Sequence, residues 1–433
     1  MEAAQRYKRS LIRLLLSNAL IKSIWILGID RWVQNEVGML AYGEYFSVWG
    51  LTLTAGFLLD MGLSTMVRRE RAAQGSSESV LAGTFWMKAS LLLVYFLAIA
   101  SIGWLNGHFS TSWFWGVAII QALNSFYVYL RAWVTATQAY AADVWFSVLD
   151  KGMLIPICAL WLSGYVTTLP ITLDAFIFLQ TASLGVSIGI VWSYLNHKQI
   201  QFVGPFTISF QRIRSALPYA ILVLLMSAHT RLDGLLIHQW STSGNLEAGR
   251  YAAGYRLIDS ANMFGYLVAS FLLPYVSRHL ADAVQLRSAI GMARNGLLLF
   301  SMSLIGFVFF FAREVSYLLY ANDPAAVARI LPILFGSVMG YSLIHVYGTV
   351  LTARGSLRLF QFVIALALVV HLVLAFIWIP TAGAVGAARS ALISQVLAGL
   401  TLMYLVHQRN GLKQPYPSYL VVIFTSFLIW FFA

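Results

Sequence analysis

The 433-residue chain has few charged residues, and this scarcity excludes a soluble globular protein. Asp, Glu, Lys and Arg together make up 10% of the residues, whereas hydrophobic residues make up 60%. Soluble domains carry roughly 25% charged residues. The apolar residues form blocks of the length that crosses a bilayer as a helix, about 20 residues. These blocks do not alternate in polarity, as the strands of a membrane barrel do. The sequence therefore predicts an all-α polytopic membrane protein.

The chain has a single cysteine and no motif with the spacing of metal ligands. The one cysteine, Cys158, falls in the middle of an apolar block, which excludes a disulfide framework and a cysteine-based metal site. There is no glycine-rich phosphate loop, no paired-carboxylate motif and no His-Asp motif. We expect neither an enzyme, nor a bound metal, nor a cofactor, and the missing nucleotide motif argues against direct use of ATP.

Thirteen apolar blocks are candidate spans, and the connections between them are short. The first block resembles a signal peptide, but it carries Arg13 and Lys22 and lacks a small-residue cleavage site, so we interpret it as a permanent helix. The candidate spans are residues 11–29, 41–63, 81–104, 112–137, 143–164, 174–196, 216–240, 251–276, 291–312, 326–351, 359–378, 384–407 and 418–433.

Two stretches of the chain look like copies of each other. Residues 38–45 read GMLAYGEY and residues 244–251 read GNLEAGRY, so that Gly, Leu, Gly and Tyr recur at identical spacing. Six helices separate the copies, which predicts two parallel six-helix repeats around a central cavity. We place an N-lobe at 1–204, a C-lobe at 205–410 and an additional peripheral helix at 411–433.

The net charge of +12 reports topology rather than a nucleic-acid partner. With the N-terminus in the cytoplasm, seventeen basic residues fall on the inner side and four on the outer side (Arg31, Arg250, Arg313 and Arg329). This asymmetry follows the positive-inside rule and sets the orientation. Nucleic-acid binding is therefore not expected.

Ionisable residues inside the spans are the most informative positions, because each costs roughly 2.5–3.5 kcal/mol at a helix centre. Such residues face a partner or water. Six are basic and are the candidates for a substrate-binding cationic cavity: Lys22, Lys88, Arg131, Lys151, Arg231 and Arg256. Four are acidic and are candidates for charge pairing or ion coupling: Asp60, Asp150, Asp233 and Asp259.

Depth along the spans predicts specific ion pairs among these residues. Arg131 is level with Asp150, Arg231 with Asp259, and Asp233 with Arg256, while Asp60 is placed to serve Lys88. If the pairs form, they are structural, and removing one partner would leave a buried charge.

Cations in excess of acids favour an anionic cargo such as a phosphate or diphosphate. Lys22 has no acid at its depth and is the best candidate to face a wet cavity. Lys22 and Arg231 lie on helices that hold equivalent places in the two repeats, so each lobe contributes a cation. Neutral polar groups in the spans suit either sugar hydroxyls or contacts between helices: Asn18, Ser23, Gln121, Asn124, Ser125, Ser227, His229, Thr230, Asn262, His345 and Gln395.

Several motifs together resemble one family of membrane transporters. They are the Gly-x-x-x-x-Gly-x-Tyr stretch followed by Phe46, the basic exit of the second span (Leu63–Glu70), Thr230–Asp233, Gly249–Arg256 and Ala353-Arg354-Gly355. On these motifs the chain resembles, over essentially its whole length, the polysaccharide transporter family. That family includes the Wzx-type O-antigen flippases and belongs to the multidrug/oligosaccharidyl-lipid/polysaccharide exporter (MOP) superfamily. Its members usually have twelve or fourteen helices, so thirteen is a departure.

The resemblance implies two helical bundles that rock around a central cavity by alternating access. It implies a multi-pass protein of the bacterial inner membrane that moves a polyprenyl-diphosphate-linked oligosaccharide, an O-antigen or lipopolysaccharide repeat unit, to the outer leaflet. The implied partners are this lipid-linked oligosaccharide, membrane lipids, H⁺ or Na⁺ as a coupling ion, and polysaccharide polymerase or assembly proteins.

Two other functions stay open at this point. An ion-coupled drug or small-cation antiporter of the same superfamily would need carboxylates in excess in its cavity, and the cations of the spans outnumber the acids. A membrane glycan polymerase or acyltransferase would need a water-accessible catalytic constellation, which the short loops do not offer.

Overall fold

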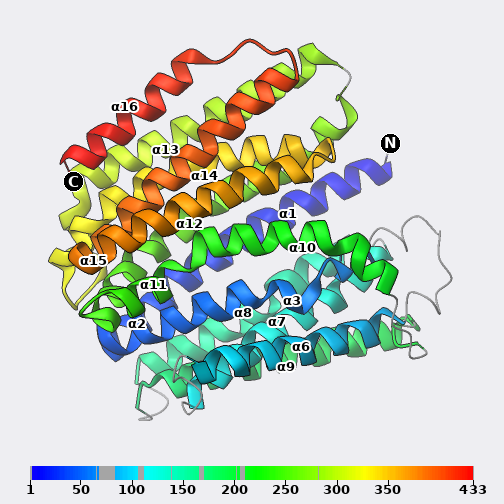
Figure 1. Ribbon diagram of the computed structural model, residues 1–433. Helices are drawn as coiled ribbons and strands as arrows, with labels where there is room; N and C mark the ends of the chain where they lie inside the picture. Colours follow the sequence, from blue (N-terminus) through cyan, green and yellow to red (C-terminus); the bar gives the residue numbers. More distant parts are fainter. Residues whose placement is uncertain are drawn as a thin grey trace. The chain divides into compact units, whose positions relative to one another are not determined.

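The computed structural model describes residues 2–64, 66–67, 83–105, 112–137, 139–164, 170–200, 202–204, 210–280 and 282–432. Within these ranges the chain forms helices and no strands, as the sequence predicts. Figure 1 shows the helices in chain order. The basic residues Arg68 and Arg69, which are part of the family resemblance, lie outside the described residues.

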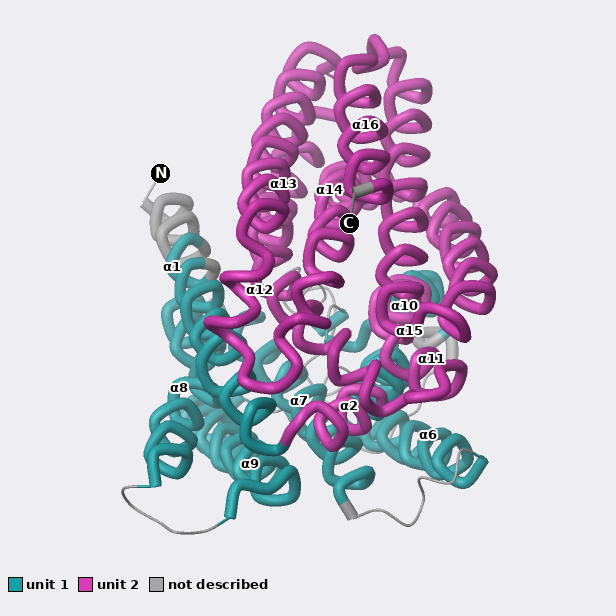
Figure 2. Tube along the Cα trace, turned by 90° about the vertical axis from the view of Figure 1, so that its left-hand side faces the viewer, with its two compact units in different colours: residues 1–37, 48–224 teal, residues 38–47, 225–433 magenta. Residues whose placement is uncertain are grey.

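The chain divides into two compact units, drawn in different colours in Figure 2. Unit 1 comprises residues 1–37 and 48–224, and unit 2 comprises residues 38–47 and 225–433. The lobe boundary near residue 205 and the peripheral place of the last helix stay predictions.

Unit 1 is built from the helices of the first half of the chain. They are α1 (Glu2–Ile24), the π-helix η1 (Trp25–Asp30), most of α2 (Arg31–Ala55), α3 (Phe57–Asp60), α6 (Thr84–Leu105), α7 (Ser112–Ala136), α8 (Tyr140–Leu162), α9 (Leu173–His197) and the first part of α10 (Phe210–Arg231). Helix α1 packs along α8, and α7 packs along α9.

Unit 2 is built around one buried helix. Its helices are the end of α10, α11 (Asp233–Trp240), α12 (Gly244–Arg278), α13 (Ala283–Leu319), α14 (Pro324–Ala353), α15 (Leu357–Arg409) and α16 (Tyr416–Phe432). Helix α14 contacts α12, α13, α15 and α16, and most of its side chains are buried. Apolar residues on all its faces explain this central place, because a helix that is hydrophobic all round is stable only when it is surrounded.

Nine helical segments of the described residues are long and apolar enough to cross a membrane, or ten if the bent pair α10–α11 is one span. Two of these segments, Ile12–Asp60 and α15, contain a break at a glycine with positive φ, Gly38 and Gly383 respectively. Each covers two of the spans that the sequence predicts. The protein is thus a multi-pass membrane protein, and every predicted span falls on a described helix.

The two copies of the repeated motif meet inside unit 2. A Cβ at Gly43 would collide with the backbone oxygen of Asn245, and a Cβ at Gly249 would collide with the backbone oxygen of Met39. Gly43 corresponds to Gly249 in the repeat, and Met39 corresponds to Asn245. The contact is therefore reciprocal, and glycine recurs at this place because only a residue without a Cβ lets the two backbones come so close.

Candidate functional site

A polar cavity of about 290 Å³ opens within unit 1, among α1, α2, α7, α8 and α9. Its polar lining comes from helical positions three or four residues apart, which share one face of a helix. Helix α7 presents Gln121, Asn124 and Arg131 in this way, and α8 presents Ser147, Asp150 and Lys151. Helix α1 adds Asn18 and Lys22.

Three of the six predicted basic residues therefore lie around one cavity: Lys22, Arg131 and Lys151. Lys22 is exposed. The Lys151 ammonium lies 4.4 Å from the centroid of the Trp25 ring and 3.7 Å from the Asp150 carboxylate. The cation–π contact and the ion pair hold the Lys151 ammonium beside the cavity.

Arg131 pairs with a different acid from the one that the sequence analysis predicts. Its Nε donates to Asp143 at 2.8 Å, and Asp150 pairs with Lys151 instead. Helix α8 begins at Tyr140, three residues before the predicted span, and this shift makes the position of Asp143 level with Arg131. The predicted Arg131–Asp150 pair is therefore wrong.

Two carboxylates that the sequence analysis did not count reduce the cation surplus of unit 1. They are Asp143 and Asp30, and Asp30 is buried and interacts electrostatically with Lys151. Neither lines the cavity, whose lining has three basic residues and one acid, Asp150. Asp30 lies just beyond the predicted span 11–29 and Asp143 is the first residue of the predicted span 143–164, and at such ends a sequence alone does not separate a loop residue from a buried one.

Lys88 and Asp60 form the predicted pair, at 3.1 Å. The Lys88 ammonium also donates to the Leu59 carbonyl at 2.7 Å and to the Ser125 hydroxyl at 2.6 Å. An ammonium has three donors, so all of them are used, and Lys88 is completely buried. This geometry makes Lys88 a structural residue of unit 1 and leaves it no donor for a substrate.

In unit 2 the predicted pair of Arg231 and Asp259 is confirmed, at 2.8 Å. The Arg231 guanidinium also lies over the Tyr255 ring, 5.3 Å from its centroid. Arg256 donates from Nε to the Tyr42 hydroxyl at 3.1 Å and lies over the rings of Tyr42 and Phe46.

The predicted pair of Asp233 and Arg256 is wrong. Asp233 pairs instead with a histidine from the distant helix α15. The Asp233 carboxylate lies 2.9 Å from Nε2 of His371 and accepts a hydrogen bond from the Tyr251 hydroxyl at 2.5 Å. The sequence analysis missed His371, because a single histidine in an apolar span has no local signal that marks its partner.

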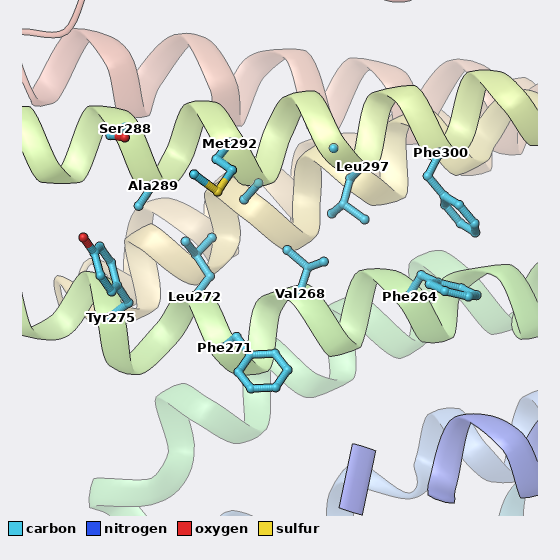
Figure 3. Close-up of a pocket in the computed structure, with 12 residues that line it drawn as sticks. Phe264, Val268, Phe271, Leu272, Tyr275, Ser288, Ala289, Met292, Leu297 and Phe300 are labelled. Atoms are coloured by element: carbon cyan, nitrogen blue, oxygen red, sulfur yellow. The ribbon is translucent and has the colours of Figure 1, made fainter. Parts of the chain in front are cut away.

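An apolar groove of about 610 Å³ runs between α12 and α13 of unit 2 (Figure 3). Phe264, Val268 and Leu272 line it from α12, and Met292 and Phe300 line it from α13. The side chains stand on the facing sides of the two helices, so the groove follows both helix axes over several turns. Its lining is almost entirely hydrocarbon.

No cluster of three or more metal-ligating side chains occurs in the described part of the chain. No family model matches the sequence. No curated protein matches it either.

Solved structures with the same fold are found among transporters of the MOP superfamily. One is an inward-facing multidrug resistance MATE family transporter of that superfamily (TM-score 0.66, 14% identity, 92% of this chain and 94% of the other covered). A second is a MOP superfamily transporter from Pyrococcus furiosus whose binding pocket is described as having reverse polarity, suggesting a different function (TM-score 0.65, 14% identity, 93% and 96% covered). A third is the D35N mutant of the Vibrio cholerae MATE transporter VcmN (TM-score 0.63, 15% identity, 94% and 98% covered).

These structures show that the chain has the fold of MOP superfamily transporters. The three structures are described as transporters. Membership of the polysaccharide transporter family within that superfamily stays a prediction from the sequence.

Proposed function

We propose that this protein is a flippase that moves a polyprenyl-diphosphate-linked oligosaccharide across a membrane by alternating access. The observation that supports the proposal most directly is the polar cavity of unit 1. Its lining combines basic side chains with amides and a hydroxyl, all on spanning helices. Such groups are expensive in a bilayer and mark a substrate path.

The lining fits a diphosphate joined to a sugar. Lys22, Arg131 and Lys151 offer charge-assisted hydrogen bonds to phosphate oxygens. Gln121 and Asn124 offer amides that replace the water lost by sugar hydroxyls, and an unreplaced hydroxyl would cost several kcal/mol. The cavity is at the lower end of the range for small-molecule sites, about 300–1,000 Å³. We infer that it holds the diphosphate and the first sugar rather than a whole repeat unit.

The apolar groove of unit 2 supports a lipid as the carrier of the cargo. A polyprenyl chain is an extended hydrocarbon, and a groove that follows two spanning helices offers it hydrocarbon contacts over several turns.

A drug or small-cation antiporter of the same superfamily is the second candidate. The multidrug transporters among the solved structures with this fold favour it. The cavity of unit 1 opposes it, because a cationic drug would meet three basic side chains and one carboxylate. A small-cation antiporter would instead need carboxylates in excess.

From the resemblance of the sequence we propose that the protein acts in the bacterial inner membrane and delivers the glycan to the outer leaflet. The distribution of basic residues is the ground for proposing that the N-terminus is in the cytoplasm. The cargo would be an O-antigen or another lipopolysaccharide or surface polysaccharide repeat unit. Polymerase or assembly proteins would receive it there.

A flipping assay with reconstituted protein tests the proposal. The probe is a fluorescent polyprenyl-diphosphate-linked oligosaccharide in proteoliposomes, and its movement is followed by a quencher or lectin added outside. Lys22→Gln should reduce the rate at least about tenfold, by the loss of one charge-assisted contact, and Lys22→Arg should retain most of it.

The matched control is Lys198→Gln, which removes one positive charge at the end of α9, outside the cavity. It should leave the rate unchanged. Wild-type flipping by Lys22→Gln, or uptake of a cationic dye with no movement of the lipid probe, would contradict the proposed cargo.

A further inference from the structure

Five buried polar side chains form a continuous chain through unit 2. Ser394 connects two histidines: its hydroxyl lies 3.0 Å from Nε2 of His229 and 3.3 Å from Nδ1 of His371. Nε2 of His371 then meets Asp233 at 2.9 Å, and the other Asp233 oxygen accepts from Tyr251. All five are less than 5% exposed.

The contacts of the Asp233–His371 pair indicate how many protons it holds. With the Ser394 hydroxyl donating to the Ala391 carbonyl at 3.2 Å, Nδ1 of His371 is the donor to Ser394 and carries a proton. Nε2 lies at ion-pair distance, 2.9 Å, from the Asp233 carboxylate, and a second proton on Nε2 fits this contact. The pair thus holds one proton more than a neutral imidazole beside a carboxylate, and its net charge is zero.

Loss of that shared proton would leave an uncompensated negative charge inside a membrane protein. Such a charge is costly unless water or another cation reaches it. The closed arrangement therefore retains the proton, and release requires the site to open.

The backbone beside Asp233 offers a place for opening. Helix α10 ends at Arg231 and α11 begins at Asp233, and the two helices meet at an angle of 51°. Broken spanning helices of this kind form ion sites in transporters, because the break lets one half-helix move.

The other titratable and charged groups that face the pair are identified. Tyr251 and Tyr255 of α12 and Tyr341 of α14 interact electrostatically with Asp233, and His229 of α10 interacts with His371. Arg231 and Asp259 lie one step further away and interact with Tyr255. Arg231 is bound to Asp259, so these two charges offset each other.

We propose that the Asp233–His371 pair of unit 2 is a proton-binding site, with Ser394, His229 and Tyr251 as its relay, and that the proton is the coupling ion of transport. The coupling role rests on the proposed transport function, whereas proton binding does not. The site takes up one proton when the pair closes and releases one when the break between α10 and α11 opens.

Infrared difference spectroscopy of the purified protein in lipid nanodiscs tests proton binding without any cargo. Between about pH 5 and 8, the range in which histidine titrates, the wild type should show a carboxyl or imidazolium band that changes with pH. Asp233→Asn and His371→Gln should each lose this band. His345→Gln, which removes another buried histidine of unit 2 outside the chain, should keep it.

The double variant Asp233→Asn/His371→Gln removes both charges together and guards against a variant that fails to fold. It should be monodisperse and lack the band. If the wild type and this double variant give the same pH-dependent spectrum, the proton site is overturned.

Coupling is then tested with the fluorescent lipid probe in proteoliposomes under an imposed pH gradient. The gradient should accelerate flipping by the wild type and leave flipping by Asp233→Asn unchanged. Equal acceleration in both would overturn the coupling role. A titrating band in a protein that moves no lipid probe would instead sustain the proton site and contradict the proposed cargo.

Discussion

One site in each unit shows a different way of holding charge inside the membrane. In unit 1, Lys22, Arg131 and Lys151 border a cavity of about 290 Å³, and Lys22 is exposed. In unit 2, Asp233 and His371 are almost completely buried and lie 2.9 Å apart as an ion pair. The same cost of a charge in hydrocarbon is met by access to a polar space at the cavity and by burial in a pair at Asp233 and His371.

This difference separates residues proposed to bind the substrate from residues that stabilise the fold or bind a proton. A charge beside a cavity can be removed at little cost in stability, because water takes the place of the lost partner. A charge in a sealed pair cannot, because its partner is left without compensation. Stability and transport should therefore respond to different substitutions.

The largest effect on stability is expected for Asp259→Ala in unit 2. It leaves the Arg231 guanidinium without its carboxylate and should lower the free energy of unfolding by about 3–5 kcal/mol. Thermal unfolding in detergent measures this. The double variant Arg231→Met/Asp259→Leu should recover most of the loss. If it recovers nothing, the ion pair contributes to stability beyond the mutual compensation of its two charges.

A smaller loss is expected where the two copies of the repeated motif meet. Gly249→Ala places a Cβ against the backbone of Met39, and overpacking of this kind costs about 1–3 kcal/mol. Gly152→Ala is the matched control, since a Cβ there meets nothing within 4 Å. The control should be neutral or slightly stabilising, and equal melting temperatures of the two variants would contradict the close contact.

A loss of about 1 kcal/mol is expected for Ser147→Ala at the cavity of unit 1, because the Asn18 amide then loses its hydrogen bond to the Ser147 hydroxyl at 2.7 Å. Asn18→Ala should cost a similar amount. The double variant should cost less than the sum of the two, as expected for residues in contact. Additive losses would mean that the bond contributes nothing to stability.

The smallest effect on stability is expected for Lys22→Gln. An exposed side chain of this kind should change the free energy of unfolding by no more than about 0.5 kcal/mol, while the same variant loses flipping in the transport assay. A large drop in melting temperature would show that Lys22 stabilises the fold. The contrast between the cavity of unit 1 and the buried pair of unit 2 would then disappear.

Ion pairs could be predicted from the sequence only where the helix ends were placed correctly. Arg231 and Asp259 were level by counting, and they pair. Arg131 was assigned to Asp150 because the start of α8 was placed three residues late, and a shift of that size moves a side chain by most of a helical turn. Asp30 and Asp143 were missed for the same reason, since residues near predicted helix ends were taken as outside the membrane.

The sequence by itself determined the helical, membrane-spanning class of the protein, the places of its apolar helices and the duplicated motif. These features are local: a block of about 20 apolar residues must be a helix in a bilayer, whatever surrounds it. The tertiary structure decided which charges meet. Asp233 and His371 are far apart in the chain, and only the packing of α11 against α15 brings the carboxylate and the imidazole together. No periodicity along one helix encodes that meeting, because the free energy of a buried pair depends on the partner that a different helix supplies.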